Sequence, residues 1–254
     1  MPVDLITVRC LSDNYAFLIH DAATGQTALV DAPEAAPIRA ALDARGWRLS
    51  DILITHHHDD HVQGLAALRG DARVIGAQAD AHRLPPLDAA VTGGDTLTVC
   101  GQRVDVIDVP GHTIGHVAFH LPEAKLLFTA DSLMAMGCGR LFEGTPAQMW
   151  DSMKKLRALP ADTTVCSGHE YTATNARFAL SLEPDNPAII SRSEAIRAAR
   201  ENGHATVPSP LSLECRTNPF LRADDPVLAQ AIDMADAQPA EIFTEIRARR
   251  DRFS

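Results

Sequence analysis

The first two thirds of the chain alternate between short apolar runs and segments with helical periodicity. The short runs are rich in β-prone residues and predict strands. Turn-forming sequences separate several of them, among them Asp21–Gly25 and Gly93–Asp95. The predicted strands cover residues 5–10, 15–19, 27–30, 52–55, 73–75, 97–99, 104–109, 117–121, 126–129 and 164–166.

Helical patterns lie between these predicted strands, at residues 35–45, 62–68 and about 145–159. The last one opens with Thr145-Pro146-Ala147-Gln148, a capping box with proline at the first helical position. Strands that alternate with helices are typical of an α/β fold.

After residue 169 the strand patterns stop and helical signals remain. Proline and cap residues predict helices from Asn186-Pro187 to near Gly203, from Pro226, and from Pro239 to about residue 250. Residues 208–219 are rich in proline and serine, and we expect an irregular crossing segment there. We therefore predict an α/β domain over residues 1–169 and a helical domain over residues 170–254.

The composition excludes several classes of protein. Of the 254 residues, 46% are hydrophobic and 22% are charged, which argues against a disordered, collagen-like or coiled-coil chain. No apolar run approaches the ~20 residues that a membrane helix needs. The N-terminus lacks a basic region followed by an apolar one, so we expect no secretory signal and a cytoplasmic protein.

The formal net charge of −10 argues against a nucleic-acid or anionic-membrane partner. A small anionic ligand is still compatible with this charge, because it responds to the local site. The five cysteines are odd in number and form no CxxC pair, so we expect reduced thiols.

The most informative stretch is His56-His57-His58-Asp59-Asp60-His61, which holds four of the eleven histidines. It follows a predicted strand and precedes a helical pattern. In an extended segment His56 and His58 point the same way, whereas Asp60 and His61 lie where the chain bends into the helix. Imidazole nitrogens and carboxylate oxygens suit Zn²⁺, Fe and Mn²⁺. The alternative is a surface loop that binds metal adventitiously.

Further candidate ligands follow three other predicted strands, and they are His112, Asp131 and His169. Packing alone does not explain a histidine or aspartate at each of these strand ends, so the sequence favours one shared metal site. His57 and Asp59 alternate away from the expected metal side, and we expect them to shape the loop.

These motifs resemble the metallo-β-lactamase superfamily. They are HxHxDH at residues 56–61, GHTxGH at 111–116, the lone Asp131, and SGHEYT at 167–172. Three further segments resemble the type II glyoxalases, or hydroxyacylglutathione hydrolases, of that superfamily. They are GCGRLFEGT at 137–145, TNPFLR at 217–222 and RARRDRF at 247–253. The resemblance covers essentially the whole chain and implies an α/β fold, the metallo-β-lactamase αββα sandwich, followed by a small all-helical C-terminal domain.

The resemblance also implies a dinuclear metal centre of two divalent ions. Zn²⁺ is the expected ion, and the same ligands would accept Fe or Mn. The first ion would be bound by His56, His58 and His112. The second ion would be bound by Asp60, His61 and His169. Asp131 would bridge the two ions, together with a hydroxide.

The implied reaction is hydrolysis of an S-(2-hydroxyacyl)glutathione. For S-D-lactoylglutathione the products would be D-lactate and glutathione, a step of methylglyoxal detoxification. The bridging hydroxide would attack the thioester carbonyl, with Asp60 and Asp131 as the catalytic carboxylates. A thiolate leaves readily, so we expect no dedicated general acid. By the same resemblance, the substrate-binding residues would be Arg140, Phe142, Tyr171, Arg247 and Arg250.

The C-terminal arginines suit this role on chemical grounds as well. Arg247 and Arg250 are three residues apart and share one face of a helix, and arginine binds carboxylates through two parallel hydrogen bonds. The alternative is a solvated basic helix end that the helix dipole favours. If the helical domain binds glutathione, truncation near residue 170 should abolish glutathione selectivity and leave a metal-binding fold. Cys138, between two glycines, is expected to pack closely rather than act as a nucleophile.

Three features depart from the family pattern. Ala130 and Ser132 flank Asp131 where relatives often have glycine and threonine. Phe142 stands where some relatives carry tyrosine, and arginine replaces their lysine at positions 140 and 250. These departures affect local geometry and affinity, not the type of reaction.

Several competing functions are compatible with the superfamily. A lactonase or phosphodiesterase is the main rival. A mono-iron persulfide dioxygenase needs neither Asp60 nor His169 as a second site and lacks the helical domain. A di-zinc β-lactamase would carry a signal peptide and a cysteine ligand, and a nuclease conflicts with the net charge. A non-catalytic metal-binding protein is the non-enzymatic alternative. We favour an enzyme that acts on a small molecule as a monomer, without nucleic acid or membrane as partner.

Overall fold

The computed structural model describes residues 3–253. The chain divides into two compact units. Unit 1 consists of the residues up to Asp108 together with Thr113–Ala130, and unit 2 consists of Val109–His112 together with the residues from Asp131 onward. No helix among residues 3–253 is long and apolar enough to cross a membrane.

The first sheet of unit 1 has six strands in the order β1-β2-β3-β4-β5-β6. They are β1 (Asp4–Cys10), β2 (Asn14–Asp21), β3 (Gln26–Val30), β4 (Leu49–Ile54), β5 (Arg73–Ala77) and β6 (Ala89–Val91). The first three pair antiparallel, and β3 to β6 pair parallel. Parallel neighbours need crossover connections, and the helices of unit 1 lie within them. These helices are α1 (Ala35–Asp43), α2 (Asp59–Val62), α3 (Leu65–Leu68) and the 3₁₀ turn η1 (Gln78–Asp80).

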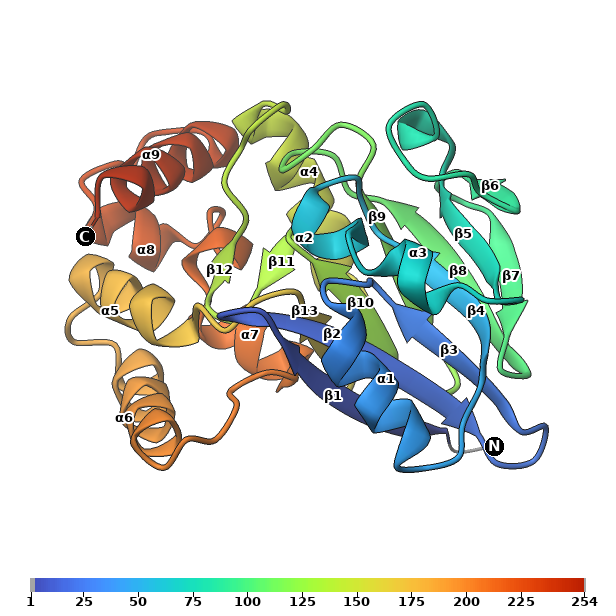
Figure 1. The fold of residues 1–254 in the computed structure, drawn as a ribbon. Coiled ribbons are helices and arrows are strands. Elements are labelled where there is room, and N and C mark those ends of the chain that lie inside the picture. Colours follow the sequence, from blue (N-terminus) through green and yellow to red (C-terminus); the bar gives the residue numbers. More distant parts are fainter. Residues whose placement is uncertain (1–2, 254) are drawn as a thin grey trace. The chain divides into compact units, whose positions relative to one another are not determined.

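The core of unit 1 forms between this sheet and its helices. Figure 1 shows α1 and α3 on one face of the sheet. The buried side of α1 carries Ile38 and Leu42, which belong to one apolar cluster with strand residues such as Leu18 and Ile52. Strand β4, which contributes Ile52 and Ile54 to this core, ends at Ile54, and the histidine-rich loop follows it.

The second sheet of unit 1 contains an antiparallel meander of four strands. They are β7 (Thr96–Val99), β8 (Gln102–Asp108), β9 (Val117–Leu121) and β10 (Leu126–Ala130). The ring centroids of Phe17 on β2 and Phe128 on β10 are 5.6 Å apart. The two sheets of unit 1 therefore pack face to face, with their apolar faces inward.

Unit 2 is mainly helical. Its helices are α4 (Pro146–Arg157), α5 (Thr172–Leu182), α6 (Pro187–Glu201), α7 (Leu211–Thr217), the 3₁₀ turn η2 (Pro219–Leu221), α8 (Pro226–Ala231) and α9 (Pro239–Arg252). It also holds two short antiparallel ladders. They are β11 (Leu133–Met134) with β12 (Gly137–Cys138), and β13 (Thr164–Ser167) with β14 (Ser209–Pro210).

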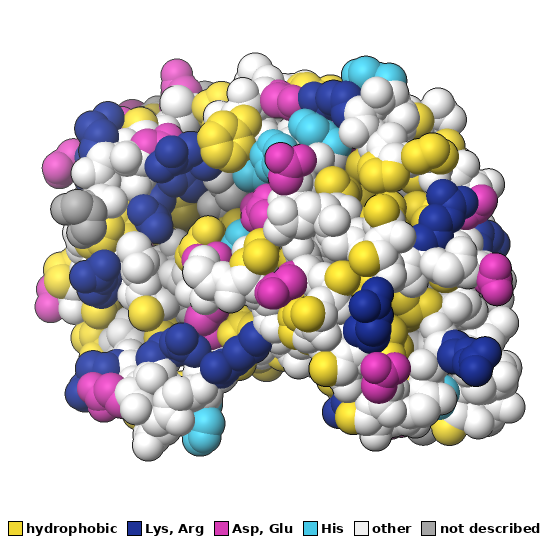
Figure 2. All heavy atoms as spheres, in the orientation of Figure 1, with side chains coloured by type: hydrophobic (Ala, Val, Ile, Leu, Met, Phe, Trp, Pro, Cys, Tyr) yellow, Lys and Arg dark blue, Asp and Glu magenta, His cyan; other side chains and the backbone are white. Residues whose placement is uncertain are grey.

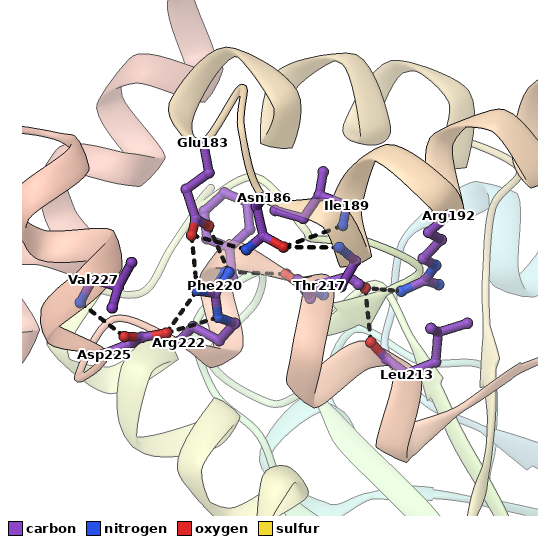
Figure 3. A network of polar contacts seen from close by, with 12 residues as sticks. Glu183, Asn186, Ile189, Arg192, Leu213, Thr217, Phe220, Arg222, Asp225 and Val227 are labelled. Atoms are coloured by element: carbon purple, nitrogen blue, oxygen red, sulfur yellow. Dashed lines mark hydrogen bonds and ion pairs between the residues drawn. The ribbon is translucent and has the colours of Figure 1, made fainter.

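Proline starts four helices of unit 2, as the sequence predicted for α4, α6, α8 and α9. Proline suits the first helical position because its missing N–H would have no partner there. The preceding residue supplies the cap in several cases. Asn186 accepts from the backbone amides of Ala188 and Ile189, and Asp225 accepts from that of Val227. Figure 3 shows both caps.

The structure differs from the predicted elements in several places. The helix expected over 62–68 is two short helices, because Gly64 lies against the backbone of Ala32 where a Cβ would be 2.8 Å from its oxygen. The segment 208–219, expected to be irregular, contains β14, α7 and the start of η2. Helix α5 was not predicted, since Tyr171 at its N-terminus offers no side-chain cap. The strands β6, β11 and β12 are too short to give a sequence signal.

Buried ion pairs hold the helices of unit 2 together. Arg222 donates to Glu183 at 2.5 and 2.9 Å and to Asp225 at 2.6 Å (Figure 3). Burial lowers the pKa of Arg222, but its hydrogen bonds with Glu183 and Asp225 outweigh this effect and raise the pKa overall. The guanidinium is thus charged although it is buried, and its carboxylate partners offset the cost of burying that charge.

We expect Glu183→Ala to lower the free energy of unfolding by about 3 kcal/mol, because it removes the principal partner of a buried charge. Urea denaturation of the purified protein measures this change. Glu245→Ala is the matched control. Glu245 pairs with Arg249 at 2.8 Å where both side chains are about one-third exposed, and such pairs contribute less than about 1 kcal/mol. Equal losses for the two variants would contradict the prediction.

Candidate metal centre

Unit 1 brings three histidines and one carboxylate together at the end of β4. The ring centroid of His56 lies 4.7 Å from that of His58 and 4.2 Å from that of His61. The Asp60 carboxylate lies 3.8 Å from His61 Nε2. His56 and His61 are fully buried, whereas Asp60 is partly exposed. All four predicted ligands of this loop therefore gather at one place within unit 1.

Asp31 fixes the orientation of this loop, and our sequence analysis missed it. Its carboxylate accepts from the Thr55 backbone and hydroxyl at 2.9 Å each, and lies 2.8 Å from His61 Nδ1. A carboxylate can only accept, so Nδ1 of His61 carries a proton, and in the neutral ring Nε2 is then the atom with the lone pair. The sequence did hold a signal for Asp31, because it follows the predicted strand 27–30 as Asp131 follows 126–129.

Two other side chains hold the same loop. Asn14 Nδ2 donates to the carboxylate of Asp60 at 2.9 Å and to its backbone oxygen at 3.1 Å. His57 Nδ1 lies 2.9 Å from the buried Asp80, so this histidine ties the loop to η1. Asp59 is exposed. The ring of His116 stacks on that of His56, with centroids 4.6 Å apart.

We expect Asp31→Asn to weaken metal binding about 10- to 100-fold, because outer partners of metal-binding histidines contribute to affinity by that amount. The apparent Kd for Zn²⁺, measured in competition with a chromophoric chelator, tests this. Asp43→Asn, at the exposed end of α1, is the control and should leave the Kd unchanged. An unchanged Kd for Asp31→Asn would contradict the role given to Asp31.

Unit 2 brings its three predicted ligands together around Asp131. One carboxylate oxygen lies 3.4 Å from His112 Nε2, and the other lies 3.3 Å from His169 Nε2. His112 Nδ1 lies 2.7 Å from the backbone oxygen of Arg140. This carbonyl can only accept, so Nδ1 carries a proton, and in the neutral ring Nε2 presents its lone pair toward Asp131. A lone pair and a carboxylate side by side repel each other unless a proton or a metal ion lies between them, and imidazole and carboxylate donors suit a metal ion.

The chain around Asp131 is tightly packed. A Cβ at Gly139 would clash with the backbone oxygen of Asp131 and would lie 3.0 Å from His112 Nδ1. Ala130 has φ of +40°, in the left-handed region that favours glycine. Ala130 therefore keeps the backbone bend at this position with some strain, where relatives often have glycine. Cys138 is buried, and burial raises the pKa of its thiol to about 11. A protonated thiol favours the packing role over a nucleophilic one.

The two predicted aromatic substrate contacts lie beside ligands of unit 2. The exposed ring of Phe142 meets the ring of His112 edge-on, with centroids 5.2 Å apart. Tyr171, also exposed, stacks on His169 at 4.7 Å. Both exposed rings thus lie directly against histidines of the candidate centre.

Two of the three predicted arginines approach one carboxylate of helix α9, and the third lies on the same helix. Arg247 is buried, donates to Asp251 at 2.7 Å and to the backbone oxygen of Cys138 at 3.0 Å. The exposed Arg140 lies 3.8 Å from the same Asp251. Arg250 donates to the neutral amide oxygen of Asn175 at 3.3 Å. Figure 2 shows basic side chains over α9.

Among the described ion pairs, Arg140 and Arg247 each have a carboxylate partner, whereas Arg250 binds only a neutral amide. Burial lowers its pKa first, and the positive charge of Arg247 lowers it further. The guanidinium stays charged at neutral pH, so an anion that binds there would relieve this cost. The cluster therefore provides the local positive charge that an anionic ligand needs on an acidic protein.

The chain matches two family models. The model described as "Metallo-beta-lactamase superfamily" matches residues 12–169, and that described as "Hydroxyacylglutathione hydrolase C-terminus" matches residues 170–253. Proteins named hydroxyacylglutathione hydrolase from Ruegeria pomeroyi and Cereibacter sphaeroides are 64% and 63% identical over 100% of this chain and of their own length.

Solved structures share the fold. The structure titled "Crystal structure of BLEG-1 B3 metallo-beta-lactamase" is similar with a TM-score of 0.67 at 20% identity, over 86% of this chain and 99% of that chain. The structure titled "Crystal structure of TTHA1623 in a di-iron-bound form" is similar with a TM-score of 0.62 at 25% identity, over 85% and 99%.

Fold and ligand types thus define a hydrolase of the metallo-β-lactamase superfamily. Within it, the chain belongs to the hydroxyacylglutathione hydrolase family. The predicted family, the metallo-β-lactamase fold with a helical C-terminal domain, and the prediction of an enzyme are confirmed. The two family matches meet at residues 169 and 170, whereas the compact units of the structure divide at residues 108–112 and 130.

Proposed function

We propose that this protein is a metal-dependent thioesterase that hydrolyses S-(2-hydroxyacyl)glutathione, with S-D-lactoylglutathione as substrate and D-lactate and glutathione as products. The full-length similarity to proteins named hydroxyacylglutathione hydrolase carries the proposal. The arginine cluster of unit 2 supports it, because glutathione bears carboxylates that arginine binds.

We assign the metal ligands as the family resemblance implies. The first ion would take His56, His58 and His112, the second would take Asp60, His61 and His169, and Asp131 would be shared by both. The fixed tautomers of His61 and His112 support this assignment, since each presents Nε2 as the ligand atom. A similar protein was solved in a di-iron-bound form, which supports two ions per chain. We favour Zn²⁺, and Fe or Mn fits the same donors.

When bound, the two ions would lower the pKa of water so that hydroxide is available at neutral pH, and would polarise the thioester carbonyl. The carboxylates of Asp60 and Asp131 would hold these ions and offset their positive charge. Hydroxide adds to the carbonyl carbon, the C–S bond breaks, and the thiolate leaves with the electron pair and is protonated by water. A thiol has a pKa near ~8.5, so the chain needs no acid of its own for this step.

Substrate binding is assigned to unit 2. Arg247, Arg250 and Arg140 would bind the glutathione carboxylates, while Phe142 and Tyr171 would flank the thioester beside His112 and His169. Residues 1–169 would thus carry the metal centre and residues 170–254 most of the glutathione site. We further propose a monomer that works on this small molecule in the cytoplasm. Its five cysteines are free thiols, as expected of a reducing compartment.

The test is hydrolysis of S-D-lactoylglutathione by the purified protein, with the metal content determined on the same sample. We expect rapid turnover, about two metal ions per chain, and loss of turnover on chelation. Two bound ions without turnover would overturn the glutathione assignment, and lactones and phosphodiesters would then be the substrates to test. Turnover that survives removal of the metal would overturn the mechanism.

A further inference from the structure

The segment from Asp131 to Arg140 supports two groups of the proposed centre. Asp131 is itself a ligand, and the backbone oxygen of Arg140 accepts from His112 Nδ1 at 2.7 Å. Between these ends lies the hairpin of β11 and β12, with two residues in each strand. A two-stranded hairpin this short is not stable alone. Its turn also contains Met136 at φ +56°, an unfavourable conformation for a residue with a side chain.

Side chains from the helices of unit 2 bind the backbone of this hairpin. Asn218 Nδ2 donates to the backbone oxygens of Met134 at 3.0 Å and Gly137 at 2.9 Å, one from each strand. The backbone amide of Met136 donates to Glu214 at 2.8 Å. Asn175 Nδ2 donates to the backbone oxygen of Ala135 at 3.1 Å. Each residue from Met134 to Gly137 therefore has a backbone group bound by a helix side chain.

Asn218 has the central place in this arrangement. It is fully buried, and its side-chain oxygen accepts from the backbone amide of Phe220 at 3.0 Å. Glu214 beside it is held by Arg192 and by Ser209. Asn218 Nδ2 also lies within donating distance of Glu214 Oε2 at 3.3 Å, and these contacts together with the Phe220 amide fix the orientation of the side chain. This gives a structural role to the segment TNPFLR, which contains none of the proposed metal ligands.

We infer that Asn218 is a positioning residue, which acts through the β11–β12 hairpin on Asp131 and on the carbonyl that orients His112. The backbone amide of Gly139 also donates to the backbone oxygen of Ser132 at 3.2 Å, so the two ends of the segment are coupled. Loss of the Asn218 donors frees the hairpin to shift, and both ligands shift with it. The inference rests on the proposed metal centre.

Asn186 provides a matched control. Each asparagine precedes a proline and accepts from backbone amides of the turn that follows, but Asn186 lies at the start of α6 and its amide donates to Glu183 (Figure 3). Asn218→Ala and Asn186→Ala therefore both remove a cap, and only the first releases the hairpin. Asn218→Ser is the second variant, because serine keeps a cap acceptor and loses the two donors to the hairpin.

The experiment titrates the full-length apo-protein with Co²⁺ against a chromophoric chelator and records the visible spectrum of the Co²⁺ protein. We expect Asn218→Ala and Asn218→Ser to raise the apparent Kd of at least one ion about 10- to 100-fold and to change the spectrum. Asn186→Ala should lower the unfolding midpoint but leave Kd and spectrum as in the wild type. Folded Asn218 variants with wild-type Kd and spectrum would overturn the inference alone. A wild-type protein that binds no Co²⁺ would overturn the metal centre as well.

Discussion

Replacing Asp131 by asparagine is expected to lower kcat for S-D-lactoylglutathione by about a thousandfold or more. Asparagine keeps the size of the side chain but removes the negative charge that faces His112 and His169 at 3.4 and 3.3 Å. It also removes the one ligand assigned to both ions. Metal ions contribute several kcal/mol to catalysis of this kind, and each 1.4 kcal/mol corresponds to about a factor of ten in rate.

The measurement combines steady-state kinetics with metal analysis of the same preparation. We expect fewer than two ions per chain in the variant, together with the loss of kcat. Asp151→Asn is the control, because Asp151 lies on α4 with a side chain that is 65% exposed and pairs only with Lys154 at 2.8 Å among the ion pairs described. A variant at Asp131 that keeps turnover within tenfold of wild type would show that this carboxylate is not shared by two ions.

The proposed ligands outside the histidine-rich loop could be nominated from the sequence because each follows a recognisable strand. His112 follows β8 by a few residues, Asp131 follows β10 directly, and His169 follows β13. Strand ends place short side chains with little freedom, so the residue type and its position in the sequence were enough to select them. Asp31 at the end of β3 shows the same signal, but a single aspartate without a neighbouring motif did not stand out.

The support of the hairpin could not be predicted, because it depends on hydrogen bonds across large sequence distances. Asn218 binds the backbone of Met134 and Gly137, which are 84 and 81 residues earlier in the chain. Backbone carbonyls carry no sequence signal, and a buried asparagine before a proline predicts only a cap. Helix α7, which carries Glu214, was not predicted either, because the prolines at its start favoured an irregular segment.

These contacts change what truncation should do. From the sequence we expected a chain cut near residue 170 to keep a metal-binding fold. The structure places the side chains that bind the hairpin beyond that point, among them Asn175, Glu214 and Asn218. Without them the backbone groups near Asp131 lose their partners, so metal affinity should fall together with glutathione selectivity. The helical region therefore supports the ligands in addition to its proposed role in binding substrate.

Substitution of Arg250 by glutamine is expected to raise KM for S-D-lactoylglutathione about 10- to 100-fold and to leave kcat within a few-fold of wild type. Hydrogen bonds to charged groups contribute roughly 1.5–3 kcal/mol, which corresponds to that range. Arg250 donates to a neutral amide and lies near Arg247, so its charge is available to a carboxylate of the substrate. Binding energy lost equally from the ground state and the transition state appears in KM rather than in kcat.

Two further variants separate the effect of the Arg250 charge from the effect of substitution at this end of α9. Arg249→Gln is the control, because Arg249 is the adjacent residue of α9 and pairs with Glu245 at 2.8 Å. Its KM should match wild type. Arg250→Lys keeps the charge that some relatives carry at this position, and should recover most of the affinity lost in the glutamine variant. If Arg250→Gln binds the thioester as tightly as wild type, or if Arg249→Gln is equally impaired, the glutathione carboxylates are not bound at Arg250.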